Sequence, residues 1–434
     1  MKSRLYSLVA ITVAAIFFAM IIGPTRTLSH RVPIKPVSGL TGSALLDDWG
    51  NRFTFLGTAV GENALRTQVR TTIAQMAMFD AVNAALNGPY RSFGSTKLPS
   101  APGASPEAAA ISAAYYVALN EFPSATAIIE NAYQTSITGV LAGDEARNQG
   151  INLGKAAAEG VLDDRKNDNR NLPELDGYTP GSGPGVWIPT SPSSPNPQTP
   201  FLQFVTPFGY DEPSRFRPAP PPALDSRTYT MDYNEVKDMG RFSKAHRTEE
   251  QSDTAKFWSP SASALWTANI RSRASSMDLL TAARFEAIGI AAVTNALIAS
   301  WDAKFTYMYW RPITAIRAGD TDGNAETEQE ADWTPFITTP SHPEYPAAHT
   351  TVGASVLGFY TVWLDTDQFD LEFKGLNNQV RNYTSVNEVH EEEGNARVWG
   401  GMHWRNSTVV GTAVGSKVGK YTATHLLKPL GSLP

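Results

Sequence analysis

The chain has 434 residues and a formal net charge of −6, and its composition is 42% hydrophobic and 18% charged. Such a composition is typical of a globular protein with a sizeable core, so wholesale disorder is excluded. The mild acidity argues against a nucleic-acid partner, because phosphate binding normally needs a surplus of basic side chains. The absence of cysteine excludes disulfides, thiolate catalysis, zinc–thiolate sites and iron–sulfur clusters.

The first residues resemble a targeting signal. Lys2 and Arg4 precede an uncharged, mostly apolar run over residues 5–23. The pattern is typical of a signal peptide, although the run is long for one and no A-x-A cleavage site follows it. Its 19 residues are also just enough for an uncleaved membrane anchor. We expect residues 1–23 to be a signal peptide or an N-terminal anchor. The protein would then be exported, periplasmic or extracellular, and would contact a membrane only through this segment.

Helical periodicity dominates the chain after a polar, loop-rich lead-in at 24–47. Apolar side chains three or four residues apart predict the first helix. The stretch Ser105-Pro106-Glu107 is typical of a helix start, with an N-cap, a first-turn proline and an acid at the positive end of the helix dipole. The expected helices of this half cover 69–86, 108–122, 125–141 and 144–162. We therefore predict a helical bundle.

Residues 172–224 interrupt the helical pattern. Fourteen of the 30 prolines lie here among aromatic side chains such as Trp187 and Phe208. A plain flexible linker would lack those aromatic residues, so we expect an ordered, irregular wrap over a packed surface. Long structureless loops inside compact domains are uncommon, which also argues against a linker between two domains.

Helical signals resume after this segment, beginning with a capping-box sequence at 248–251. The later expected helices cover 276–300, 349–363 and 404–427. Alternating strand patterns are scarce, and no repeat of 20–50 residues is apparent. The predicted fold class is all-α, with one large domain over residues 48–430.

Lys304 and Arg311 mark the first of three segments that carry candidate chemistry. They lie seven residues apart, so a continuous helix would present both cations on one face to a single oxyanion. Taken alone, such a pair usually belongs to a solvated face. Its neighbours here include Phe305, Tyr309 and Trp310, however, and cations in apolar surroundings need an anion.

The second segment is a proline-rich approach to a helix that we expect to start near Pro346. Three prolines in seven residues make this approach stiff. The free backbone N–H groups of the first turn, around Ala348 and His349, predict an anion site. His349 at its rim is placed for proton transfer near neutral pH, and a purely structural hydrogen bond is the alternative.

Arg397, Gly400-Gly401 and His403 define the third segment. Arg397 offers two parallel donors to oxyanion oxygens, and the glycine pair permits close backbone approach. His403 can present a neutral ring nitrogen as a metal ligand or a nucleophile. Each segment is a weak signal by itself, but three cations and two histidines between residues 304 and 403 make a coherent set.

The spacings K-x6-R-P, P-x-x-H and R-x5-H resemble the signature shared by vanadium-dependent haloperoxidases and type 2 phosphatidic acid phosphatases. The five residues that fall on it, in order, are Lys304, Arg311, His349, Arg397 and His403. Three stretches are similar to the haloperoxidase branch, especially its bacterial members. They are Pro-Ser-His-Pro-Glu-Tyr-Pro, Met-Phe-Asp-Ala-Val-Asn-Ala at 78–84 and the proline-rich middle. The likeness extends from about residue 48 to 427.

This resemblance implies two helical bundles in one domain, with orthovanadate as the cofactor held within residues 300–427. His403 would ligate the vanadium, and His349 would hydrogen-bond the apical oxygen and handle protons as peroxide replaces it. The groups that would hold the other vanadate oxygens are Lys304, Arg311, Arg397 and the backbone of Ala348. The implied partners are hydrogen peroxide, halide and a small organic acceptor, and the implied product is hypohalous acid.

Trp301 and His342 fall where the family places residues that flank the halide. An imidazole at position 342 is similar to the members that use bromide or iodide, whereas the fungal chloride oxidisers carry phenylalanine there. The resemblance therefore implies that bromide or iodide is favoured over chloride. A turn-stabilising role for His342 is the alternative.

Two positions depart from the family pattern. Ala347-Ala348 stands where Ser-Gly is usual, which removes a hydroxyl donor worth about 1–2 kcal/mol if buried but keeps the backbone N–H. Ser407 stands where an aspartate usually follows His403 by four residues. Without that carboxylate we expect His403 to be less basic and less firmly oriented, and vanadate affinity to fall.

Two other functions stay open at this stage. In an acid phosphatase of the same superfamily, His403 would be the nucleophile that forms a phospho-histidine and His349 the acid for the leaving group. The length of the chain and the lack of several membrane spans argue against a lipid phosphatase. A non-catalytic relative would merely keep an anion pocket. The sequence does not predict the organic acceptor or the oligomeric state.

Overall fold

The computed structural model describes residues 39–174, 179–190, 195–375 and 379–431, and residues from Ser38 onward form one compact unit. The predicted targeting segment lies outside the described residues. The helices of the first half are α2 (Ser43–Ala59), α3 (Ala64–Ala85), α4 (Pro106–Glu121), α5 (Thr126–Thr138) and α6 (Asp144–Asp164). The later helices are α7 (Arg227–Met239), α8 (Glu249–Phe257), α9 (Ala262–Ala274), α10 (Leu279–Tyr307), α11 (Pro312–Arg317), α12 (Ala348–Leu364), α13 (Val386–Trp399) and α14 (Arg405–His425).

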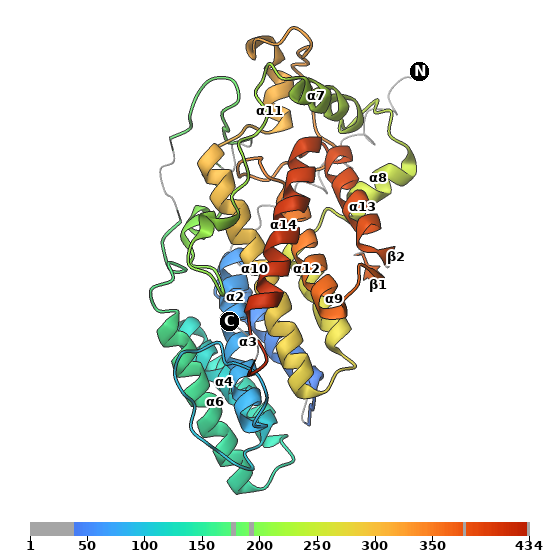
Figure 1. The fold of residues 1–434 in the computed structure, drawn as a ribbon. Coiled ribbons are helices and arrows are strands. Elements are labelled where there is room, and N and C mark those ends of the chain that lie inside the picture. Colours follow the sequence, from blue (N-terminus) through green and yellow to red (C-terminus); the bar gives the residue numbers. More distant parts are fainter. Residues whose placement is uncertain (1–38, 175–178, 191–194, 376–378, 432–434) are drawn as a thin grey trace, which may run out of the picture. The chain divides into compact units, whose positions relative to one another are not determined.

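The strands that the structure describes form a single antiparallel hairpin, β1 (Gln368–Lys374) with β2 (Val380–Ser385), in which Leu371 pairs with Tyr383. All the other long elements are helices (Figure 1). The predicted all-α fold class is therefore confirmed, with the hairpin as a small addition that the scarce strand patterning did not predict.

Local sequence signals set the start of two predicted helices. The Ser105 hydroxyl accepts a hydrogen bond from the Ala108 N–H at the start of α4. Thr248 and Gln251 make both reciprocal bonds of a capping box at the start of α8. These bonds satisfy N–H groups that have no carbonyl partner inside the helix, so both helix starts lie where the sequence predicts them.

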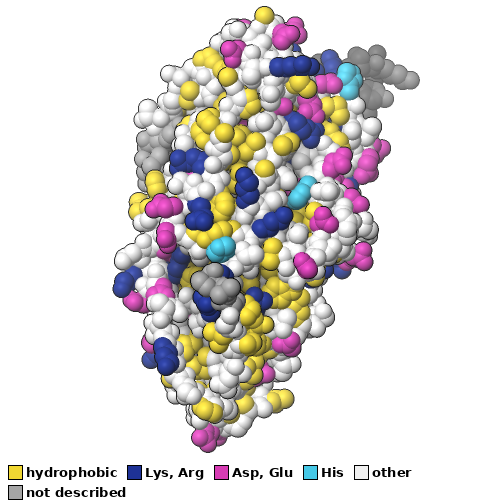
Figure 2. Space-filling view, viewed as in Figure 1, with side chains coloured by type: hydrophobic (Ala, Val, Ile, Leu, Met, Phe, Trp, Pro, Cys, Tyr) yellow, Lys and Arg dark blue, Asp and Glu magenta, His cyan; other side chains and the backbone are white. Residues whose placement is uncertain are grey.

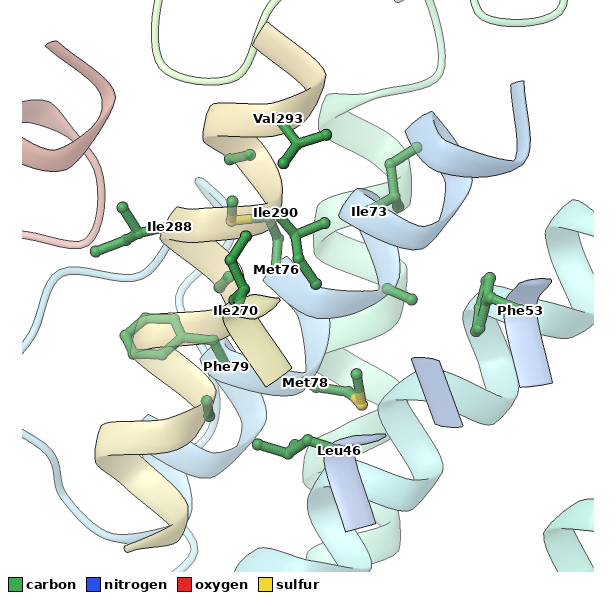
Figure 3. Close-up of a cluster of buried hydrophobic side chains, with 14 of the residues drawn as sticks. Leu46, Phe53, Ile73, Met76, Met78, Phe79, Ile270, Ile288, Ile290 and Val293 are labelled. Carbon is green, nitrogen blue, oxygen red and sulfur yellow. The ribbon is translucent and has the colours of Figure 1, made fainter. Parts of the chain in front are cut away.

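The lead-in predicted over 24–47 is wrong at its end, because α2 begins at Ser43. Figure 3 shows the physical reason: Leu46 and Phe53 of this helix lie among apolar side chains of α3, α9 and α10. Both side chains are fully buried. Burial of this apolar face stabilises the helix.

The long helix α10 is shared by two groups of helices (Figure 1). It packs against α3, which belongs with α4 and α6 to the first bundle, and against α12 and α14, which form the centre of the second. Among the described residues, α10 is the one helix long and apolar enough to cross a membrane, and 94% of its apolar window is buried inside the protein. That degree of burial is typical of a core helix.

Helices α12 and α14 touch through their backbones. A Cβ atom at Gly415 would collide with the Thr351 carbonyl oxygen, and one at Gly419 would collide with the Ser355 carbonyl oxygen. Only glycine permits this approach, because any side chain would force the helices apart. The packing holds the first turn of α12, which contains His349, beside α14.

Residues 172–224 contain only the short 3₁₀ turns η2 (Pro200–Phe204) and η3 (Pro213–Phe216) among their described part. Trp187 and Phe208 are fully buried, whereas Phe204 is exposed. The Phe208 N–H donates to Asn295 Oδ1 of α10 at 2.8 Å. The segment is thus an irregular, packed cover on α10, as its aromatic residues predict.

Candidate oxyanion site

Lys304 and Arg311 lie on different helices, so the predicted single helical face is wrong. Met308 adopts a left-handed conformation, with a φ of 46°, and ends α10. Lys304 therefore lies in the last turn of α10, and Arg311 is the N-cap residue of α11. The turn between them still directs both cations to the segment 342–346.

Lys304 is fully buried and donates three hydrogen bonds to backbone carbonyl oxygens. Its Nζ lies 3.0 Å from Pro343 O, 2.8 Å from Glu344 O and 2.6 Å from Pro346 O. Burial, and then Arg311, hold the pKa of this ammonium well below its usual range. The three bonds fasten the approach to α12 onto the end of α10.

Arg311 connects the other two segments. Its Nε donates to His342 O at 2.9 Å and its Nη2 to His342 Nδ1 at 3.0 Å. Its Nη1 donates to Met402 O at 2.9 Å and to His403 Nε2 at 3.2 Å. Burial lowers the pKa of this guanidinium to about 10. One side chain thus contacts both the second and the third segment of the predicted site.

Arg397 and His349 are held by neighbouring carbonyl groups in the turn between α8 and α9. Arg397 Nη1 donates to Trp258 O at 2.8 Å, and its Nη2 lies 3.3 Å from Met402 Sδ. His349 Nε2 donates to Pro260 O at 2.9 Å. Arg397 Nε is buried and has no hydrogen-bond partner.

Among the described residues no carboxylate is hydrogen-bonded to the cations of the site, although the buried acids Glu344 and Glu393 lie near Arg311 and Arg397. On the surface in Figure 2, by contrast, basic and acidic side chains are spread together over one face. Lys304, Arg311 and Arg397 are each at most 2% exposed. Burial lowers the pKa of Arg397 to about 9, with Glu393 opposing the shift and Arg311 adding to it. Burial and these cations also hold the pKa values of His349 and His403 well below their usual range. The site disfavours further positive charge and favours an anion.

His403 has a carboxylate partner, which corrects the expectation based on Ser407. Its Nδ1 lies 2.7 Å from Glu344 Oε1, which also accepts the Trp404 N–H at 3.1 Å. Glu344 comes from the proline-rich approach to α12, far from position 407 in the chain. The ring is therefore firmly oriented without an aspartate at 407. The sequence stretch Pro-Glu-Tyr-Pro contains this acid, but nothing in its spacing indicates a bond to His403.

Two buried imidazoles, those of His342 and His403, are hydrogen-bonded to Arg311, and these bonds bear on their tautomers. A guanidinium can only donate, so His403 Nε2 accepts from Arg311 and carries the lone pair. A neutral His403 then has its proton on Nδ1 and donates it to Glu344. His342 Nδ1 lies 3.0 Å from Arg311 Nη2, which can only donate, and 3.2 Å from Pro343 O, which can only accept. The shorter contact favours Nδ1 as the acceptor, with the proton on Nε2.

Trp301 and His342, the candidate halide residues, are neighbours. Their ring centroids are 5.0 Å apart, and both side chains are buried. Trp301 Nε1 lies 3.4 Å from Gln198 O, so its donor points to the proline-rich cover. His342 also has the structural contact with Arg311, and the geometry thus accommodates both interpretations of this residue.

The helix start predicted near Pro346 lies at Ala348, with Ala347 as the N-cap residue. Ala347 N–H donates to Ser407 O at 3.1 Å, which ties the start of α12 to α14. Gly401 has a φ of 77°, and a Cβ there would collide with Gly240 O. The close approach predicted for Gly400-Gly401 is thus an approach to the end of α7.

The donor set fits a small oxyanion such as vanadate. The three cations donate to carbonyl groups, imidazoles and a sulfur atom in place of carboxylates. The buried Arg397 Nε is an unused donor, and His403 Nε2 presents a lone pair to the same cluster. Sequence reasoning missed the supporting carbonyl groups of Trp258 and Pro260, because backbone acceptors carry no signal in side-chain patterns.

Comparison with known proteins gives relatives with the same fold. A family model described as the VCPO second helical-bundle domain matches residues 284–431. The vanadium chloroperoxidase of Curvularia inaequalis is 24% identical over 326 residues, covering 55% of this chain and 53% of that protein. The chain thus spans about half the length of this curated relative.

Two solved structures are similar over most of the chain. The crystal structure of a bacterial vanadium-dependent iodoperoxidase has a TM-score of 0.76 at 22% identity, covering 89% of this chain and 97% of that chain. The holo form of a bacterial vanadium-dependent chloroperoxidase has a TM-score of 0.62 at 18% identity, covering 84% and 92%. Residues 284–431 are therefore a second helical bundle of the VCPO type, and the chain as a whole has the fold of the vanadium-dependent haloperoxidases, the family that its motifs resemble.

Proposed function

We propose that this protein is an exported, vanadate-dependent haloperoxidase. It would use hydrogen peroxide to oxidise bromide or iodide, in preference to chloride, to hypohalous acid, consuming one proton and releasing water. The observation that carries the proposal is the buried cluster of three cations around His403 Nε2, to which no carboxylate of the described part of the chain is hydrogen-bonded. The relatives named above are a vanadium chloroperoxidase and a bacterial vanadium-dependent iodoperoxidase.

Vanadate, when bound, would supply a Lewis-acidic centre that makes peroxide electrophilic without a change in the oxidation state of the metal. His403 Nε2 would ligate it, and Arg311, Arg397 and Lys304 would neutralise its oxygens, together with the first-turn N–H of Ala348. Lys304 already donates all three of its bonds to carbonyl groups, so it would exchange one of them for the oxyanion.

His349 would move the protons. Its Nε2 donates to Pro260 O, which fixes the ring and leaves Nδ1 as the nitrogen that accepts or returns a proton. The neighbouring cations favour the neutral ring, the form that removes a proton from incoming peroxide. The same nitrogen would return that proton when water leaves.

Halide would bind beside His342 and Trp301. The His342 Nε2–H is a donor held in place by the Arg311 bond to the other ring nitrogen. Replacement by phenylalanine removes this donor, so His342→Phe should lower turnover with bromide relative to chloride. Export rests on the N-terminal pattern of Lys2, Arg4 and the apolar run 5–23.

Bromination of a phenol dye with hydrogen peroxide, with and without added orthovanadate, tests the proposal. Turnover that needs vanadate, and that is lost in His403→Ala, is the expected result. His425→Ala is the matched control, because this exposed histidine lies at the far end of α14 and stacks on Tyr421. Turnover that survives in His403→Ala would contradict the site.

An acid phosphatase of the same superfamily is the second candidate. The observation in its favour is the carboxylate bond to His403 Nδ1, since a positioned acid assists an imidazole nucleophile. Hydrolysis of an aryl phosphate that orthovanadate inhibits, without bromination, would support this function. A protein inert in both assays would be a non-catalytic relative that keeps the anion pocket.

A further inference from the structure

Glu344 is the buried acid bonded to His403, and its surroundings define it as an acceptor. The side chain has no solvent exposure. Its Oε1 accepts two N–H groups, from His403 Nδ1 at 2.7 Å and from the Trp404 backbone at 3.1 Å. Its own backbone is fastened on both sides, because its N–H donates to Tyr309 O at 2.9 Å and its carbonyl oxygen accepts from Lys304.

Position 407 lies next to this acid. Ser407 is buried in the first turn of α14 and is close enough to Glu344 to influence its pKa, although neither Ser407 Oγ nor Glu344 Oε2 reaches hydrogen-bond geometry with a partner. A longer acidic side chain at 407 would therefore approach the same region as the Glu344 carboxylate. Two buried acids there would repel each other.

We infer that Glu344 is the positioning residue for His403, and that it supplies from the approach to α12 the carboxylate that Ser407 lacks. Its bond holds the proton on His403 Nδ1 and thereby aims the Nε2 lone pair at the cation cluster. The inference rests on the proposed function only in treating His403 as the group that meets the oxyanion. The two positions should be exchangeable, so that one acid at either place orients the ring.

Relocation of the carboxylate is the sharpest test. In the full chain, Glu344→Met should weaken orthovanadate binding about 10- to 100-fold, the usual cost of removing a partner of a metal-bound histidine. The double variant Glu344→Met with Ser407→Asp should regain most of the affinity. Glu344→Met with Ser407→Asn is the matched control, because it has the same shape without the charge and should not recover.

A second readout requires no vanadate. Protein labelled with ¹⁵N only in histidine should show a strongly hydrogen-bonded Nδ1–H resonance, assigned to His403 by its loss in His403→Asn. This resonance should disappear in Glu344→Met and return in the Ser407→Asp double variant. A resonance that persists in Glu344→Met, or that fails to return, would overturn the inference.

The two readouts separate the possible failures. If orthovanadate does not bind the unmodified protein, the proposed function fails, while the resonance still decides the role of Glu344. Should Glu344→Met not fold, Glu344→Gln decides instead, because an uncharged acceptor should keep the resonance but shift it upfield. An unchanged resonance in Glu344→Gln would count against a carboxylate bond.

Discussion

Two groups of buried arginines in this protein have opposite surroundings. In the first group, near the end of α4, Arg170 bonds to Glu121 and to Asp168, each at 2.7 Å. Burial works against the charge, but the two carboxylates raise the pKa of Arg170 above its ordinary value. Every positive charge in this group has an acid beside it, so it needs no further partner.

In the second group, Arg311 and Arg397 bond to carbonyl groups, imidazoles and a methionine sulfur. Burial lowers their pKa values to about 10 and about 9. The comparison shows that burial of a cation does not by itself identify a site. The lack of a carboxylate hydrogen-bonded to the cation does, among the described residues, because the cation can then neutralise an anion that enters.

The largest expected effect is on the neutralised group. Glu121→Ala leaves Arg170 buried without this partner and should lower the free energy of unfolding by about 3–5 kcal/mol. Urea denaturation measures the change. Glu159→Gln is the control, because its pair with Lys155 is solvent-exposed and should matter by less than about 0.5 kcal/mol. Equal losses in the two variants would refute the contrast.

In the second group, which contains Arg311 and Arg397, we expect a loss of orthovanadate affinity and little loss of stability. Arg397→Gln keeps a donor for Trp258 O but removes the charge, so orthovanadate affinity should fall about 10- to 100-fold, as for a lost hydrogen bond to a charged group. Calorimetric titration measures the affinity. The unfolding free energy should change by far less than in Glu121→Ala, and an equally large loss of stability would mean that Arg397 is structural.

Glu286 extends the comparison to a buried acid. Burial raises the pKa of Glu286 to about 8, with Asp47 adding to the rise and Arg271 opposing it. The folded protein then holds this proton more tightly than the unfolded chain, so stability falls as pH rises from about 4.5 to 8.

Glu286→Gln should remove this pH dependence. Between about pH 4.5 and 8 the variant should gain stability relative to the unmodified protein by at most about 1.4 kcal/mol per pH unit, and urea denaturation at several pH values measures the difference. A difference that does not change with pH would show that the carboxyl is not the titrating group.

The smallest effect is expected at the helix cap of α4, in the first bundle. Ser105→Ala removes the bond to the Ala108 N–H and should cost about 1 kcal/mol of stability, with orthovanadate affinity unchanged. Ser105→Asp keeps an acceptor and is the matched control. A change in affinity would show that this cap in the first bundle influences the site in the second.

The sequence by itself determined the features that depend on near neighbours. The starts of α4 and α8 follow from caps within three residues, and the motif spacing selected the five polar groups that the structure brings together. Apolar periodicity was enough to predict the all-α class, because a helix repeats its buried face every three or four residues.

Only the tertiary structure decided which distant groups meet. The bond from His403 to Glu344 spans 59 residues of chain, and the break at Met308 separates Lys304 from Arg311 without separating their targets. The same holds for α2, whose helix is stabilised by the core that it covers. Such contacts depend on how helices pack, and no local pattern encodes the partner that a buried acid or cation will find.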